Sequence, residues 1–158
     1  MEWLVWAGGF VLLLFGAVVF FGAPYLPTMS PQVQAAFALL RLKPGQTVLE
    51  LGCGDGKVLL AAAREGYKAI GFEINPVLVL VALWKTRKYR SMVTVRWANF
   101  WRTPWPPADG VFVFLLDKYM QRLDERMKVY KKPLVSVAFT VPGKAVAAEK
   151  NAVFLYRY

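Results

Sequence analysis

One ten-residue run, Val48-Leu49-Glu50-Leu51-Gly52-Cys53-Gly54-Asp55-Gly56-Lys57, has the residue types of a ligand-binding turn. A strand of apolar residues leads into alternating glycines, and a helix is expected from Lys57 onward. Glycines let the backbone turn sharply and approach a ligand without a Cβ in the way, and the helix N-terminus that follows offers free N–H groups. The run therefore predicts a nucleotide-type site, with ligand contacts from Gly52, Cys53, Gly54, Asp55 and Gly56.

Two common phosphate-binding turns do not fit this spacing. A P-loop requires G-x-x-x-x-G-K-[ST], but Leu51 stands at its first glycine and Val58 at its hydroxyl position. A dinucleotide-binding turn requires G-x-G-x-x-G, and Lys57 stands at its third glycine. The pattern that remains is an acidic residue followed by x-G-x-G-x-G.

Polar residues at the ends of the next two predicted strands fit an adenosine. Glu73 ends an apolar strand 19 residues after Gly54, and a carboxylate can accept hydrogen bonds from both hydroxyls of a ribose. Asn99 follows the third strand, where its side-chain oxygen could accept from an adenine amine. Phe100 is available to pack on the ring. Together with the glycine run, these residues predict an adenosine-containing ligand.

The elements that must position these residues alternate along the chain. A helix is expected from Ser30-Pro31 to the Pro44-Gly45 turn, because serine caps helices and proline suits the first helical position. Strand, helix and strand then repeat, which implies an α/β fold with a Rossmann-like, doubly wound, mostly parallel sheet, closed by a C-terminal antiparallel hairpin. The expected strands are 47–51, 68–72, 92–97, 110–116, 134–139, 145–148 and 153–156, and the expected helices are 57–65, 76–88 and 118–130.

The N-terminal segment predicts a membrane anchor. Residues Trp3 to Ala23 carry no charge, and about 20 apolar residues at 1.5 Å each span a hydrocarbon core. A cleaved signal peptide would have a positive flank and a shorter apolar stretch, whereas Met1-Glu2 precedes this one. Since 158 residues suit one domain with a proper core, we expect a transmembrane anchor over 1–24 and a single catalytic-size domain over 25–158.

The charge pattern indicates an anionic partner. All 20 lysines and arginines follow Leu40, and only nine of the ten acidic residues do, so this part of the chain is strongly basic. Within the predicted helix 76–88, the run from Val77 to Trp84 is apolar on every face. Its outer face is therefore expected to rest on the bilayer or on a membrane-embedded substrate, with anionic headgroups meeting Lys85, Arg87, Lys88 and Arg90. Nucleic acid would also suit the charge, but a solvated basic face is the default. The absence of histidine excludes a histidine-bound metal and a Ser-His or Cys-His pair.

The run from Glu50 to Gly56 resembles the first motif of the class I S-adenosylmethionine-dependent methyltransferases. The order of an apolar helix, Pro24-Tyr25-Leu26-Pro27-Thr28, E-L-G-C-G-D-G-K and G-F-E-I-N-P resembles a narrower family. That family is the single-span lysine methyltransferases related to the mitochondrial enzymes that modify the adenine nucleotide translocase and the c-ring protein of ATP synthase. The similarity extends through Asn99-Phe100-Trp101 to the terminal Tyr-Arg-Tyr.

The resemblance implies an enzyme, a cofactor and a set of site residues. Glu50 would hold the amino group of S-adenosylmethionine, and the G-F-E-I-N-P element would place Glu73, Ile74 and Asn75 against it. Tyr25 and Thr28 would lie over the cofactor, and Asp117 or Tyr25 would orient the acceptor or receive a proton; Asp117 could equally cap a helix. No metal site is expected.

The acceptor remains open at this level. The resemblance favours a lysine of a membrane-embedded protein, with the catalytic domain on the cytosolic side, where the cofactor is made. A methyltransferase for a lipid, quinone or other small hydrophobic acceptor would explain the anchor equally well. A catalytically silent cofactor-binding module at the membrane is a third alternative.

Overall fold

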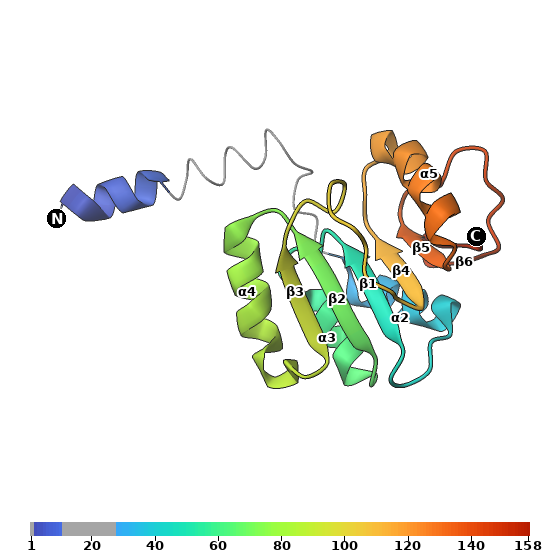
Figure 1. Cartoon of the computed structure of the whole chain (residues 1–158), viewed down its shortest axis with the longest axis horizontal. Helices are drawn as coiled ribbons and strands as arrows, with labels where there is room; N and C mark the ends of the chain where they lie inside the picture. The colour runs from blue at the N-terminus through green and yellow to red at the C-terminus, as the bar shows by residue number, and fades with distance from the viewer. Residues whose placement is uncertain (1, 11–27) are drawn as a thin grey trace.

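The computed structural model describes residues 2–10 and 28–158. Residues 28–158 form an α/β fold around a seven-stranded sheet of order β3-β2-β1-β4-β5-β7-β6 (Figure 1). The strands are β1 Thr47–Leu51, β2 Lys68–Glu73, β3 Val93–Trp97, β4 Gly110–Val113, β5 Leu134–Val137, β6 Ala148–Lys150 and β7 Val153–Tyr156. The helices are α2 Ser30–Leu40, α3 Lys57–Arg64, α4 Pro76–Thr86 and α5 Met120–Tyr130, with short 3₁₀ turns η1 Arg87–Tyr89 and η2 Asp117–Tyr119.

The sheet confirms the predicted topology. Strands β1 to β5 pair in parallel, and β7 joins β5 antiparallel before β6 completes the hairpin. The order in which strands are added to the sheet reverses at β1: β2 and β3 follow on one side of it, and β4 and β5 follow on the other. In open α/β sheets, the crevice at such a reversal, outside the carboxyl ends of the strands, is where ligands bind.

Two apolar layers cover the sheet, one on each face. Helices α2, α3 and α4 lie on one face, where alternate residues such as Val48 and Val135 pack beneath them. On the other face Leu49, Leu51 and Val111 pack under α5 and the loop between β3 and β4. Successive strand residues point to opposite faces, so both sets are buried and the central strands are apolar almost throughout.

Several predicted boundaries were wrong by a few residues near the carboxyl ends of β4 and β5. The strand expected to reach Leu116 ends at Val113, and η2 precedes α5. The strand expected to reach Phe139 ends at Val137, because Ala138 has a positive φ of 66° that breaks the extended backbone. The residues just beyond these ends are not in strands, although they are as apolar as the buried strands that precede them.

The hairpin and the end of α4 also differ from the prediction. The first hairpin strand is Ala148–Lys150 and not 145–148, because the turn lies at Asn151 and Ala152, whose φ values are 53° and 57°. A two-residue hairpin turn of this kind requires positive φ at both positions. Helix α4 ends at Thr86, and η1 continues it to Tyr89.

The predicted anchor lies largely outside the described residues. Residues 2–10 are helical, and their side chains are exposed. Across residues 2–10 and 28–158, no helix is both long enough and apolar enough to span a bilayer. The remainder of the predicted span, from residue 11 to Ala23, and the domain boundary at 24–25 fall in the undescribed stretch 11–27, so both stay predictions.

Candidate functional site

The glycine turn between β1 and α3 takes a shape that only glycine adopts easily. Gly52, Gly54 and Gly56 have φ values of 83°, 51° and 78°, in the left-handed region. The turn is tied to the neighbouring strand, because Gly52 N and Cys53 N donate to Phe72 O at 2.9 and 2.8 Å. The turn is therefore fixed at the carboxyl edge of the sheet, as the sequence predicted.

Gly56 is required for a second reason, its contact with α4. A Cβ at this position would lie 2.9 Å from the Ala82 Cβ and 3.0 Å from its Cα. The close approach brings the first turn of α3 against the middle of α4. The glycine turn, α3 and α4 thus form one packed unit.

Glu73 holds the glycine turn to the end of β2. Its Oε2 accepts from Gly54 N at 2.8 Å, and its Oε1 accepts from Ile74 N and Asn75 N, both at 2.8 Å. A carboxylate offers about four lone-pair sites, so a ligand hydroxyl can still share this group. Glu73 is buried, and in addition to the predicted ribose contact it joins the glycine turn to the end of β2.

Glu50 is a buried carboxylate with an unused acceptor. It lies in β1, just before the glycine turn, and its Oε2 has no hydrogen-bond partner among the described residues. Burial raises the pKa of the Glu50 carboxyl well above its usual value, and the nearby charges of Asp55 and Glu73 raise it further. A buried acceptor left without a donor is costly, so this position favours a ligand that carries a cationic donor.

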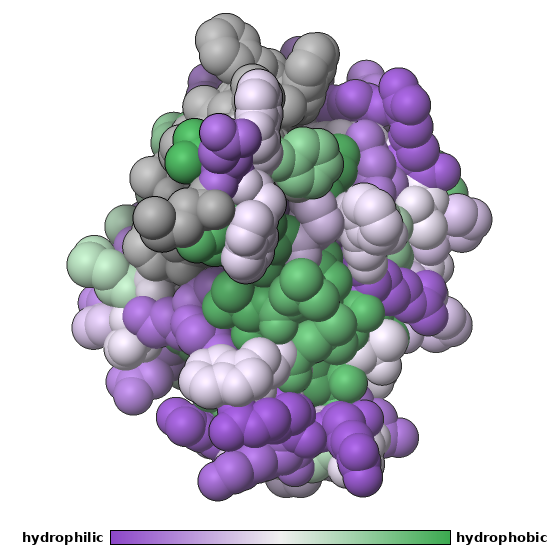
Figure 2. Space-filling view, turned by 90° about the vertical axis from the view of Figure 1, so that its left-hand side faces the viewer, coloured by the Kyte–Doolittle hydropathy of each residue, from purple (hydrophilic) through white to green (hydrophobic). Residues whose placement is uncertain are grey.

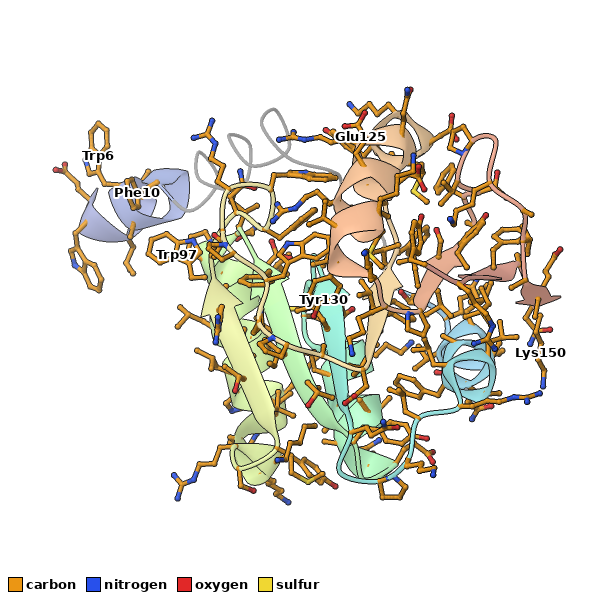
Figure 3. The ribbon with its side chains drawn as sticks, turned by 45° about the vertical axis from the view of Figure 1, so that its right-hand side comes forward. Trp6, Phe10, Trp97, Glu125, Tyr130 and Lys150 are labelled. Carbon is orange, nitrogen blue, oxygen red and sulfur yellow. The ribbon has the colours of Figure 1, made fainter. Side chains whose placement is uncertain are left out.

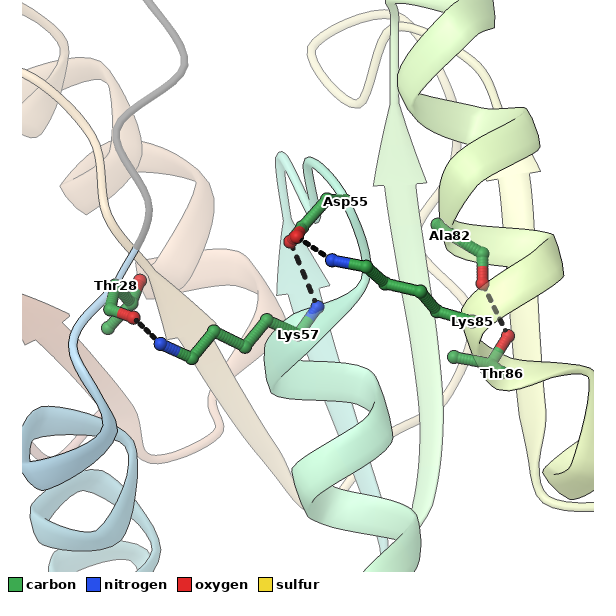
Figure 4. A network of polar contacts seen from close by, with 6 residues as sticks. All are labelled: Thr28, Asp55, Lys57, Ala82, Lys85 and Thr86. Carbon is green, nitrogen blue, oxygen red and sulfur yellow. Dashed lines mark hydrogen bonds and ion pairs between the residues drawn. The ribbon is translucent and has the colours of Figure 1, made fainter.

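Asp55 and two lysines form a polar network around the turn (Figure 4). Lys85 on α4 forms an ion pair with Asp55 Oδ2, and Asp55 Oδ1 accepts from Lys57 N at 3.2 Å. The Lys57 side chain reaches the other way and donates from Nζ to Thr28 O at 2.8 Å. The segment before α2 is thereby held against the glycine turn, and Thr28 is buried there.

Ile74 and Asn75 connect the β2 end to α4. Asn75 caps the helix, with Oδ1 accepting from Val77 N at 2.9 Å and from Leu78 N at 3.4 Å. Ile74 is exposed, and its carbonyl oxygen accepts from Trp97 Nε1 at 3.0 Å. Both residues therefore border the site through their backbone, while the Asn75 side chain serves the helix.

Asn99 and Phe100 lie at the adjoining end of β3. Ala98 N donates to Glu73 O at 3.0 Å, which brings this segment beside the β2 end. Asn99 Oδ1 accepts from Trp101 N at 2.9 Å, so the oxygen expected to read the adenine already has one donor. Phe100 is half-buried, with its carbonyl oxygen held by Arg126 of α5 at 2.6 Å.

The remaining predicted residues are Asp117, Cys53 and Tyr25. Asp117 is exposed at the start of η2, past the end of β4. It is not a helix N-cap, because Leu116 holds that position for η2 and Tyr119 holds it for α5. Cys53 is buried, and desolvation raises the pKa of its thiol far above the ordinary value, so it packs as an inert side chain. Tyr25 lies outside the described residues.

Sequence reasoning missed Arg126 and gave Lys85 a different role, a contact with anionic headgroups, whereas the structure pairs Lys85 with Asp55 of the glycine turn. Each is far along the chain from its partner, and neither belongs to a motif, so no local signal identifies it. No side-chain contact was predicted for Lys57, whereas in the structure its Nζ donates to Thr28 O.

Comparison with known proteins agrees with this geometry. The adenine nucleotide translocase lysine N-methyltransferase of Mus musculus is 34% identical over 109 residues, 66% of this chain and 47% of that protein. A protein-lysine N-methyltransferase of Saccharolobus islandicus is 29% identical over 127 residues, 76% of this chain and 79% of that protein. An RNA methyltransferase of Salinibacter ruber, solved with S-adenosyl-L-homocysteine, superposes with a TM-score of 0.76 at 26% identity, over 84% of this chain and 92% of that one.

The chain spans about half the length of the vertebrate lysine methyltransferases that it matches. The chain also matches a family of domains. Residues 50–148 match the ANTKMT methyltransferase domain, and this stretch runs from Glu50, just before the glycine turn, to the first residue of β6. It covers more than half of the chain, and the predicted resemblance is confirmed: the chain belongs to the ANTKMT methyltransferase domain family.

Proposed function

We propose that the protein is an S-adenosylmethionine-dependent methyltransferase that modifies a lysine side chain of a membrane-associated protein. The observation that carries the proposal is the unpartnered Oε2 of Glu50, buried beside the glycine turn. The cofactor has an ammonium group on its methionine part, and an ammonium is the donor that this oxygen lacks.

The described residues suit the rest of the cofactor. Gly52, where an added Cβ would meet no atom within 4 Å, leaves room for the methionine part along the turn, and Glu73 keeps acceptor capacity for the ribose hydroxyls. Asn99 and Phe100 border the place of the adenine. The same set rejects a triphosphate, because the buried carboxylates Glu50 and Glu73 would face its negative charge.

The chemistry required of the chain is mainly placement. When bound, S-adenosylmethionine supplies a methyl group on a sulfonium, which is already a good electrophile. The chain must hold a neutral amine in line with that methyl group and exclude water. An apolar wall beside a positive sulfonium lowers the pKa of a lysine amine and so favours its neutral form. We assign the orienting role to Tyr25 and Asp117 as part of this proposal.

The substrate class is supported by relatives and by the N-terminal sequence. The relatives from Mus musculus and Saccharolobus islandicus are both named as lysine methyltransferases. An uncharged run from Trp3 to Ala23 would hold the domain beside a membrane-embedded acceptor, and we place the domain on the cytosolic side, where the cofactor is made.

The test is methyl transfer to membrane proteins in a matched pair of variants. Membranes from cells that lack the gene are incubated with the full-length protein and isotopically labelled S-adenosylmethionine, and lysine-containing peptides are searched for added methyl groups. Glu50→Gln serves as the impaired variant, and Glu65→Gln, an exposed glutamate at the end of α3, serves as its control.

Each outcome separates one alternative from the others. Label on protein lysines with the wild type and Glu65→Gln, and much less with Glu50→Gln, supports the proposal. Label recovered in the lipid extract would assign a lipid or quinone acceptor instead. Tight cofactor binding without transfer to any fraction would indicate a silent binding module.

A further inference from the structure

The outer face of α4 is an exposed apolar surface. Leu80, Leu83 and Trp84 are 67, 46 and 63% exposed, while Val79 and Ala82 on the opposite side of the helix are buried against the sheet. Trp97, at the end of the adjacent edge strand β3, is 68% exposed. We call Leu80, Leu83, Trp84 and Trp97 the α4 face.

The surface view from this side shows how the face is bounded. Figure 2 shows a continuous apolar area at its centre, with hydrophilic residues gathered along its lower border. Figure 3 shows Trp97 beside the end of β3, on the side of the molecule away from Glu125 of α5. The outer face of a solvated helix is usually polar, whereas a contiguous exposed apolar surface of this kind usually marks an interaction site.

The border of the α4 face is positively charged. Residues 76–97 contain five basic residues and no acidic one. Lys85 pairs with Asp55, and Arg87, Lys88 and Arg90 follow the helix near the surface. The Arg87 guanidinium lies 4.6 Å from the centre of the Trp84 ring and donates to Trp84 O at 2.7 Å, so this cation sits at the edge of the apolar surface.

We propose that the α4 face docks on an anionic lipid surface, with its leucines at the acyl boundary and Arg87, Lys88 and Arg90 among the headgroups. A flat apolar helix face with a basic border and tryptophans is the composition of an interfacial membrane contact. A second copy on the same face would place these cations against one another. Nucleic acid would leave Leu80 and Leu83 without an apolar partner.

The docking contact is mechanically linked to the ligand site. Trp97 donates from Nε1 to Ile74 O, and Trp97 of β3 is paired in the sheet with Glu73 of β2. Asn75 starts α4 one residue after Ile74. A bilayer against the α4 face would therefore hold the carboxyl ends of β2 and β3 at headgroup height, independently of the acceptor that the enzyme modifies.

The experiment measures the environment of a fluorophore at one position of the full-length protein. The chain has a single cysteine, Cys53, which is buried, so a cysteine introduced on the surface can be labelled selectively. A polarity-sensitive label is placed at Leu83→Cys and, as the matched control, at Val129→Cys, an apolar position on α5 that is 83% exposed. Both proteins are reconstituted in phosphatidylcholine vesicles with and without phosphatidylglycerol.

In the anionic vesicles, we expect the fluorescence emission of the label at position 83 to shift to shorter wavelength. We also expect doxyl groups on the lipid chains to quench it. The label at position 129 should remain open to aqueous iodide in both. Changing Arg87, Lys88 and Arg90 together to glutamine should reduce the ratio of docked to undocked protein by about 100-fold, since each cation near such a surface contributes about 1 kcal/mol.

Three results would overturn the proposal. A label at position 83 that stays open to iodide in anionic vesicles means that the face is free in water. A label shielded from iodide but not quenched by doxyl lipid means that protein covers it. Equal quenching in neutral and anionic vesicles, unchanged in the triple variant, removes the role of the cations. Unchanged cofactor affinity in the labelled protein shows that it is folded.

Discussion

Replacing Glu50 by glutamine removes a buried charge while keeping the side-chain shape, and we expect stability and cofactor affinity to change in opposite directions. Without a ligand the carboxylate is desolvated, and its Oε2 has no donor among the described residues. With the cofactor bound, the same oxygen would accept from an ammonium. Glutamine should therefore stabilise the free protein and weaken binding.

The magnitudes follow from the contacts. Glutamine is also polar, so the variant recovers only the extra cost of burying a charged group over a neutral one, about 1–3 kcal/mol. For a chain of this size that corresponds to a rise in Tm of several degrees, at about 2–4 °C per kcal/mol. Losing one charge-assisted hydrogen bond of about 1.5–3 kcal/mol weakens the Kd for S-adenosylmethionine by about 10- to 150-fold.

The stability gain should depend on pH. Burial raises the pKa of Glu50 in the folded protein above its ordinary value. Below the pKa of the unfolded chain, Glu50 is protonated in both states, so wild type and variant should be equally stable in this respect. As the pH rises through that value, only the unfolded state ionises freely, and the wild type loses stability until the pH passes the folded pKa. The advantage of the variant is thus absent in acid and complete in alkali.

Denaturant unfolding across this pH range and calorimetry of cofactor binding measure the two effects. Glu65→Gln is the control, because Glu65 is exposed and should change neither quantity. Two results would refute the role assigned to Glu50, a buried carboxylate that lacks a donor until the ligand binds. One is a variant less stable than the wild type at alkaline pH, and the other is a variant that binds S-adenosylmethionine with unchanged affinity.

Three further substitutions test the site and its supports. Glu73→Ala should weaken cofactor binding by more than about tenfold and reduce stability by about 3 kcal/mol, because three backbone N–H groups lose a charged acceptor; calorimetry and urea unfolding measure both, and unchanged affinity in a folded variant would remove the ribose assignment. Gly56→Ala should cost about 2–5 kcal/mol, from the positive φ and the contact with Ala82, and a Tm within about a degree of the wild type would contradict this. Asn75→Ala should cost about 1 kcal/mol in chemical denaturation through loss of the α4 cap, and an equal loss in Asn75→Ser would exclude capping as the reason.

Local sequence signals were sufficient for the order of the elements and for the turn at their centre. Alternating strand and helix patterns predicted the parallel sheet, and the glycine spacing predicted the turn at Gly52–Gly56, because positive φ is a property of single residues. The strand-terminal position of Glu73 was likewise evident. Boundaries at Val113, Val137 and the hairpin were not, since strand ends depend on where pairing stops and on how a turn closes.

The sequence alone determined the family, the class of ligand and the kinds of residue that could hold it. Only the tertiary structure decided how those residues are used. It assigned the Glu73 carboxylate to the backbone of the glycine turn, joined Lys85 to Asp55 across 30 residues, and left Glu50 buried with an unmatched oxygen. It also left the outer side of α4 uncovered by the other described elements. Partners and burial are set by which elements pack together, and no local pattern in the chain encodes contacts between segments so far apart.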